Sequence, residues 1–178
     1  MNSGRILRLI ILSMVVSVGL GAQTSQQVSR GDIYQKWIAE DVAYIITPEE
    51  RAEFDRLTSD KDRDHFVVEF WLRRDPTPGT PVNEFKEEHY RRIAYSNQHF
   101  AEARVGWKTD RGRIYIVNGP PEEIGRVTPS ASTGPVHPAE IWRYKDGRQF
   151  RFVDSCDCGK YELEIPILDF RSELNRLR

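Results

Sequence analysis

The strongest constraint on the fold is a change of sequence pattern between Gly106 and Pro121. Before this stretch apolar residues recur at helical spacing, and after it they alternate as in β-strands. Gly106 can take the positive φ that a chain leaving a helix often needs, and residues 110–112 read Asp-Arg-Gly, a turn composition. Residues 113–118 are β-branched and aromatic, which predicts a central strand ending before Gly119. Helices first and strands afterwards are typical of an α+β fold.

Three helices are predicted upstream, at about residues 48–57, 60–74 and 83–103. Thr47 is a suitable N-cap for the first, and Glu50 is its partner in a capping box. A serine followed three residues later by an acid precedes the second helix in the same way. The third and longest helix carries a stripe of residues at helical spacing. This stripe consists of Phe85, His89, Ile93, Ser96 and Phe100.

Downstream, the predicted strands are residues 141–145, 148–153 and 161–165. Asp146 and Gly147 separate the first two, a strong signal for a two-residue hairpin. With the central strand they form an antiparallel meander of three to five strands, and we expect the helices to pack on its aromatic face. That face consists of Trp142, Tyr144, Phe150, Phe152, Tyr161 and Leu163.

The amino terminus has the pattern of a signal peptide over residues 1–22. Arg5 and Arg8 precede an apolar run over residues 9–20, and small residues follow up to Ala22. About a dozen apolar residues fall short of the ~20 that cross a membrane, so no permanent transmembrane helix is expected. We therefore expect export to the periplasm or the extracellular space, with an uncleaved signal anchor as the alternative.

The rest of the chain is predicted to hold one domain, at residues 34–167, in which order begins near Tyr34. A flexible leader rich in Gln and Ser is expected at residues 23–33, and a charged tail at residues 168–178. Residues 128–138 are rich in Thr, Ser and Pro and predict a long loop.

Charge and motif content exclude several classes of function. Removing residues 1–22 leaves 24 basic and 27 acidic side chains, so the electrostatic basis for binding nucleic acid is missing. The sequence contains no cofactor-binding loop, no ordered catalytic triad and no complete zinc signature, so no cofactor is expected.

Several separated motifs together resemble the GWxTD domain family of bacterial secreted and envelope proteins. The resemblance covers roughly residues 34–165 and implies a fold unit without an established activity, so it supplies no catalytic residue. It implies instead a structural motif made of Gly106, Trp107, Thr109, Asp110, Gly119 and Pro120. The matching segments are Gly106 to Asp110, Arg111 to Ile116, Gly119 to Pro121, Phe70 to Pro76, Asn83 to Phe85 and Glu140 to Trp142.

One candidate site combines Asp110, Arg113 and Arg74. If the helices bring these residues together, they form an acid–base centre or an anion-binding cleft, as in a hydrolase, because Arg holds carboxylates and phosphates by paired hydrogen bonds. The structural interpretation is stronger: an Asp at such a position usually accepts backbone N–H bonds, and the neighbouring Arg locks the turn. Asn97, in the long helix, is expected to hydrogen-bond the Gly106 segment.

A second candidate is the pair Cys156 and Cys158. Two thiolates at this spacing can share a metal ion, but a structural zinc site needs about four ligands and few others are near. In an oxidising compartment the two cysteines can instead form a reducible disulfide with each other or pair with another chain, and the remaining alternative is that both are free thiols. His89 is expected to be a hydrogen-bonded core residue and not a general base.

Aromatic residues offer a third candidate site. Trp107, Trp142, Tyr115 and Tyr144 could form a stacking platform for sugar or peptidoglycan, although such residues more often belong to the hydrophobic core.

The leading expectation is an exported, non-catalytic interaction or structural domain of the bacterial envelope. Its partner would be an envelope protein or a glycan, and Trp107 is a candidate contact.

Overall fold

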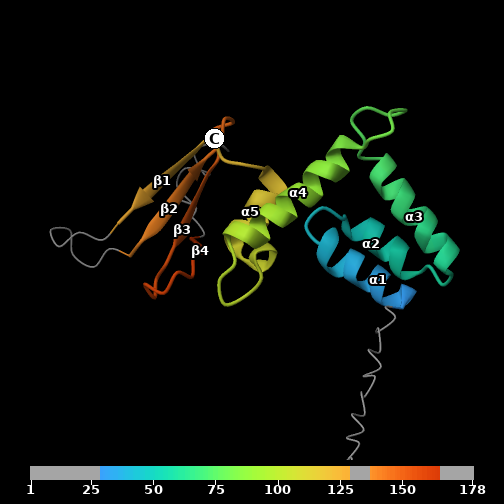
Figure 1. Cartoon of the computed structure of the whole chain (residues 1–178), viewed down its shortest axis with the longest axis horizontal. Helices are drawn as coiled ribbons and strands as arrows, with labels where there is room; N and C mark the ends of the chain where they lie inside the picture. Colours follow the sequence, from blue (N-terminus) through green and yellow to red (C-terminus); the bar gives the residue numbers. More distant parts are fainter. Residues whose placement is uncertain (1–28, 129–136, 165–178) are drawn as a thin grey trace, which may run out of the picture.

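The computed structural model describes residues 29–128 and 137–164, in which five α-helices precede a four-stranded antiparallel sheet (Figure 1). The α+β class is therefore confirmed. The helices are α1 (Arg30–Lys36), α2 (Pro48–Asp55), α3 (Asp60–Leu72), α4 (Glu84–His99) and α5 (Asp110–Asn118). The strands are β1 (Glu123–Val127), β2 (Ala139–Arg143), β3 (Gln149–Val153) and β4 (Glu162–Glu164).

The first three helices form a core of their own. The capping box at α2 is present, since the Thr47 hydroxyl accepts from the Glu50 N–H at 3.2 Å and the Glu50 carboxylate accepts from the Thr47 N–H at 3.1 Å. A π-helical turn, Trp37–Asp41, follows α1 and directs Trp37 inward. The buried residues of this first core are Tyr34, Trp37, Ile38, Val42, Phe54, Phe66, Phe70 and Trp71.

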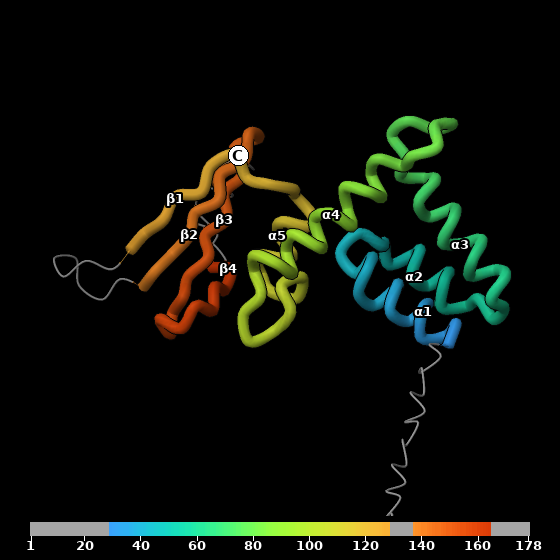
Figure 2. Tube along the Cα trace, in the orientation of Figure 1, coloured from blue at the N-terminus to red at the C-terminus, as the bar shows by residue number. Residues whose placement is uncertain are grey.

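Helix α4 links this core to the sheet, running from the helical group to the side of the strands (Figure 2). Near its start, His89 lies 5.6 Å from Trp71, between ring centroids. At its end, Phe100 lies 5.3 Å from Trp142 of the sheet. The two ends of one helix therefore belong to two different cores.

The sheet has the strand order β1-β2-β3-β4, with every neighbouring pair antiparallel. Its expected aromatic face is confirmed, and the end of α4 together with α5 packs against it. The two predicted helices over residues 48–57 and 60–74 do not lie on the sheet but pack in the first core. The second core contains Phe100, Ile114, Trp142, Tyr144 and Phe152, flanked by Tyr115, Phe150, Tyr161 and Leu163.

The predicted central strand over residues 113–118 is wrong, because this segment is helix α5. Its alternation has a physical cause: the helix is buried on two sides. Ile114 packs in the sheet core, whereas Ile116 faces the opposite way, beside Ile45 and His89. Residues two apart on a helix point nearly opposite ways, so burial on both sides imitates a strand pattern.

Three smaller features differ from the predictions. Helix α1 begins at Arg30, earlier than the expected start of order at Tyr34. Strand β1 was not predicted, since its five residues include two charged side chains and a glycine, which weaken the strand pattern. The β2–β3 hairpin has Lys145 to Gly147 between the paired residues Tyr144 and Arg148, one residue more than predicted. The predicted 128–138 loop and 168–178 tail lie largely outside the described residues.

Candidate functional site

The turn between α4 and α5 is where two backbones come unusually close. Gly106 does not have the expected positive φ; it is a glycine because a Cβ there would lie 1.9 Å from the Ser96 carbonyl oxygen of α4. A Cβ on Gly112 would lie 2.0 Å from the Gly106 carbonyl oxygen. The predicted 110–112 turn is instead the first turn of α5. Close packing, and not a turn conformation, requires both glycines.

Thr109 starts helix α5. Its hydroxyl donates to the Gly106 carbonyl at 2.8 Å and accepts from the Gly112 N–H at 3.0 Å, and the side chain is fully buried. Both hydrogen-bonding capacities of the hydroxyl are therefore used within the turn. A threonine N-cap of this kind stabilises a helix by about 1 kcal/mol.

Trp107 is half-buried and fastens the turn to the helices on either side. Its backbone N–H donates to the Asn97 side chain at 2.9 Å, as predicted. The Tyr44 hydroxyl donates to the Trp107 carbonyl at 3.1 Å, and the two rings meet edge to face at 5.8 Å. Tyr44 belongs to the N-terminal half of the chain, so Trp107 connects the turn to the first group of helices.

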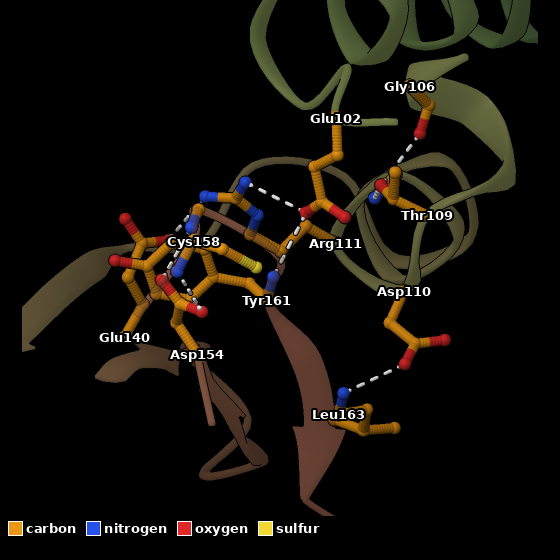
Figure 3. A network of polar contacts seen from close by, with 12 residues as sticks. Glu102, Gly106, Thr109, Asp110, Arg111, Glu140, Asp154, Cys158, Tyr161 and Leu163 are labelled. Atoms are coloured by element: carbon orange, nitrogen blue, oxygen red, sulfur yellow. Dashed lines mark hydrogen bonds and ion pairs between the residues drawn. The ribbon is translucent and has the colours of Figure 1, made fainter. Parts of the chain in front are cut away.

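Asp110 joins α5 to the sheet. Its carboxylate accepts from the Leu163 N–H of β4 at 2.8 Å (Figure 3). Arg113 lies 3.5 Å from the other carboxylate oxygen. The structural interpretation anticipated a carboxylate that accepts a backbone N–H beside a neighbouring Arg, but the residue starts α5 instead of a turn, and the donor lies on β4. Of the candidate acid–base set, the structure thus brings only Asp110 and Arg113 together.

Arg74 lies in the first core, away from Asp110. Its guanidinium donates to Glu50 at 2.6 Å and 2.9 Å and stacks 3.6 Å above the centre of the Phe70 ring. Burial alone would raise the pKa of Glu50, but hydrogen bonds from Arg74 and from the Thr47 N–H outweigh burial and lower the pKa to about 2. Arg74 therefore ties α3 to the start of α2.

Gly119 ends helix α5 with a positive φ of 80°, and a side chain there would collide with the guanidinium of Arg92. Its carbonyl accepts from the buried Tyr144 hydroxyl at 3.0 Å. Pro120 follows at the mouth of a pocket, so these two residues turn the chain from α5 towards β1.

A network centred on Arg111 was not predicted. Its guanidinium donates to Glu102 at 3.1 Å, lies 3.7 Å from Glu140 and stacks 4.2 Å above the Tyr161 ring (Figure 3). Glu102 also accepts from the Tyr161 N–H at 3.1 Å. Two nearly buried acids therefore share one cation, as buried charges require. The sequence placed Arg111 and Glu140 in separate motifs, and nothing in their spacing indicated that they meet.

Beside this network is a pocket of about 320 Å³, within the size range of small-molecule and peptide side-chain sites. The pocket lies on the aromatic face of the sheet, which is covered by the end of α4 and by α5, and it extends to the edge strand β1. Glu140 forms part of its wall and accepts from the Trp142 indole N–H at 3.1 Å, while exposed Arg126 of β1 lies 3.5 Å from Glu140. The pocket is lined by Tyr95, His99, Phe100, Arg111, Tyr115, Pro120, Pro121, Ile124, Arg126, Glu140 and Trp142.

The proposed aromatic platform is not assembled as a surface. Trp142 is fully buried and Tyr144 is 9 % exposed, so both belong to the core. Burial raises the pKa of Tyr144 to about 12. Tyr115 stacks on Tyr95 at 4.5 Å in the pocket wall, apart from Trp107, which contacts Tyr44.

Cys156 and Cys158 form a disulfide in the β3–β4 connection. Asp154 lies close enough to share a metal ion with the two sulfurs, but bonded sulfurs are not the thiolates that a metal needs. Burial opposes ionisation of Asp154, yet hydrogen bonds from the N–H groups of Gly159 and Cys158 lower its pKa. The pairing corresponds to the disulfide alternative.

His89 is a core residue, as predicted. It is 3 % exposed, and its Nε2 is 2.6 Å from the Asp41 carbonyl oxygen, which accepts from the ring N–H. Burial lowers the pKa of His89, so the neutral ring is favoured.

None of the helices in the described part of the chain has the length and apolar character to span a bilayer.

Comparison with known proteins identifies the family to which the chain belongs. Searches of curated proteins and of solved structures returned no match. A family model described as the GWxTD domain matches residues 31–155, which run from the second residue of α1 to just past β3 and include the whole α4–α5 turn. The chain therefore belongs to the GWxTD domain family.

Proposed function

We propose that this chain is an exported binding domain of the bacterial envelope that acts by recognition and not by catalysis. The observation that carries the proposal is the pocket beside Arg111. Residues from three separated family motifs meet there: Arg111 and Tyr115 from α5, Pro120 and Pro121 from the following turn, and Glu140 from β2.

The family motifs divide their residues between two tasks. Gly106, Thr109 and Asp110 make internal contacts that hold α4, α5 and β4 together. Arg111 and Tyr115, one helical turn apart on α5, instead reach the pocket wall. This division supports a rigid framework that presents a recessed contact site.

The chemistry of the pocket suits recognition. Its aromatic and proline side chains offer apolar contact, and Arg126 and Glu140 supply a donor and an acceptor at one end. Arg126 is 70 % exposed, so it is available to a partner. The wall therefore combines polar and apolar surface in similar amounts, which suits contact with an envelope protein or a glycan chain.

The N-terminal pattern supports export, and a fusion tests it directly. Residues 1–33 placed before a reporter that is active only outside the cytoplasm should yield activity, whereas Leu9→Arg together with Leu12→Arg should abolish it. Activity that persists in the doubly charged variant would contradict export by this segment.

Binding is tested with purified envelope fractions. The domain should co-sediment with cell-wall glycan or form a stoichiometric complex with one purified envelope protein, and Arg126→Ala should weaken that binding at least tenfold. Arg30→Ala is the matched control, because Arg30 is 67 % exposed, is paired with a single acid and lies on α1 away from the pocket. Equal loss in both variants, or binding to neither fraction, would contradict the proposal.

A further inference from the structure

The β3–β4 connection holds a disulfide that a second protein can reach. Cys156 and Cys158 are bonded to each other with only Asp157 between them, and both cysteines are exposed. Access to a sulfur atom is the first requirement for attack by an external thiolate. We propose that this disulfide is a thiol–disulfide exchange site, which accepts two electrons from a protein dithiol.

A bond over so short a loop adds less to the stability of the fold than one that closes a long loop. The entropy that a disulfide removes from the unfolded chain grows with the logarithm of loop length, and here the two cysteines are only two positions apart. The short loop therefore favours reduction relative to a disulfide that closes a long loop.

The loop is held by contacts that do not depend on the disulfide. The buried Asp154 carboxylate accepts from the Cys158 N–H at 3.1 Å and from the Gly159 N–H at 2.6 Å (Figure 3). The Asp154 N–H donates to the Pro138 carbonyl at 2.9 Å, which fixes the carboxylate to the start of β2. Cys158 therefore stays near Cys156 after reduction, and re-closure is an intramolecular reaction at high effective concentration.

The exchange proceeds in two balanced steps. A thiolate of the dithiol attacks one exposed sulfur, the Cys156–Cys158 bond breaks, and a mixed disulfide forms. The released cysteine leaves as a thiolate beside the Asp154 carboxylate and takes a proton from water. The second thiol of the dithiol then loses its proton and attacks the mixed disulfide, which gives an oxidised partner and a second protonated cysteine.

The test uses the purified full chain, with its disulfide formed, in buffers containing graded ratios of reduced and oxidised dithiothreitol or glutathione. Free thiols are trapped with maleimide and counted by mass spectrometry, while circular dichroism follows the fold. We expect one reversible two-thiol transition, with the temperature of unfolding changed by less than about 3 °C. Reduction that occurs only with loss of structure, or a reduced chain that does not re-form the bond, would overturn the proposal.

Variants of Cys156 and Asp154 test the exchange reaction and the positioning of Cys158 separately. In oxidised glutathione, Cys156→Ser should accumulate a mixed disulfide at Cys158, whereas the wild-type chain should resolve it by ring closure at least tenfold faster than a second glutathione does. Asp154→Ala should slow that closure several-fold, and Asp154→Asn, which keeps one acceptor oxygen, should slow it less. If Asp154→Ala does not fold, the Asn variant and the wild-type closure rate still decide the matter. Closure no faster than the intermolecular reaction would refute the exchange site.

Discussion

Single carboxylate side chains connect the secondary-structure elements of this domain. Asp110 was a candidate for acid–base chemistry and Glu50 a predicted capping residue, and each joins two secondary-structure elements through hydrogen bonds. Asp110 attaches the start of α5 to the backbone of β4, and Glu50 attaches the start of α2 to Arg74 of α3. The same residue types that could serve catalysis are used here to connect helices and strands.

The Asp110 contact predicts a graded loss of stability. Asp110→Ala should lower the free energy of unfolding by about 2 kcal/mol, because the Leu163 N–H loses a charged acceptor. Asp110→Asn keeps a neutral acceptor and should cost about 1 kcal/mol. Urea denaturation followed by circular dichroism measures both. Unchanged stability in both variants would show that the contact with β4 has no structural weight.

Glu50 predicts acid sensitivity. Its pKa in the folded chain is about 2, below the ordinary value of 4.5, so its contribution is complete above about pH 4.5 and is lost as pH falls towards 2. The loss should be about 2 kcal/mol. Denaturation at a series of pH values should show a smaller decline for Glu50→Gln, which is already destabilised at neutral pH. Glu53→Gln, exposed on the same helix, is the control and should retain the full decline.

At the scale of elements, helix α5 depends on two glycines that have no space for a side chain. Gly112→Ala places a Cβ 2.0 Å from the Gly106 carbonyl oxygen, so the start of α5 must move, and we expect a loss of about 3 kcal/mol or more. Gly31→Ala is the matched control in α1, where the nearest atom is 3.6 Å away. It should be neutral or stabilise the fold by up to about 1 kcal/mol. Thermal denaturation that ranks the two variants the other way would contradict this packing.

The elements also show what a sequence can and cannot specify. Caps at Thr47 and Ser59 and the aromatic alternation of the sheet are local signals, and they located α2, α3, β2 and β3 correctly. Helix α5 was misassigned because burial on two opposite sides gives Ile114 and Ile116 the pattern of a strand. A local pattern records which residues are buried, not which neighbours bury them.

In the candidate site, too, contacts between residues close in the chain were predicted, and contacts between distant residues were not. Asn97 was correctly paired with the Gly106 segment, since both lie close together in the chain. The Glu102, Arg111 and Glu140 network was missed, because most of α5 and the whole of β1 separate Arg111 from Glu140 in the chain, and their approach depends on the register of β2. Arg74 was grouped with Asp110 on residue type alone, and the fold places it in the other core.

At the scale of the molecule, two hydrophobic cores share helix α4, and this predicts that they unfold together. Phe70 is fully buried in the first core and Phe152 in the second. Either residue changed to Ala should cost about 3–5 kcal/mol and shift the same single transition. Tryptophan fluorescence and far-UV circular dichroism should give coincident curves. Two separate transitions, each moved by only one variant, would show that α4 does not couple the cores.

Helix α4 also sets the angle between the two halves of the chain. Its 16 residues span about 24 Å, and each residue turns the helix by about 100°. One inserted residue at its exposed midpoint would therefore swing the sheet and its pocket a quarter-turn or more around the first three helices. Trp107 could then no longer contact Tyr44. The number of residues in α4 therefore fixes the rotation of the sheet relative to the first three helices.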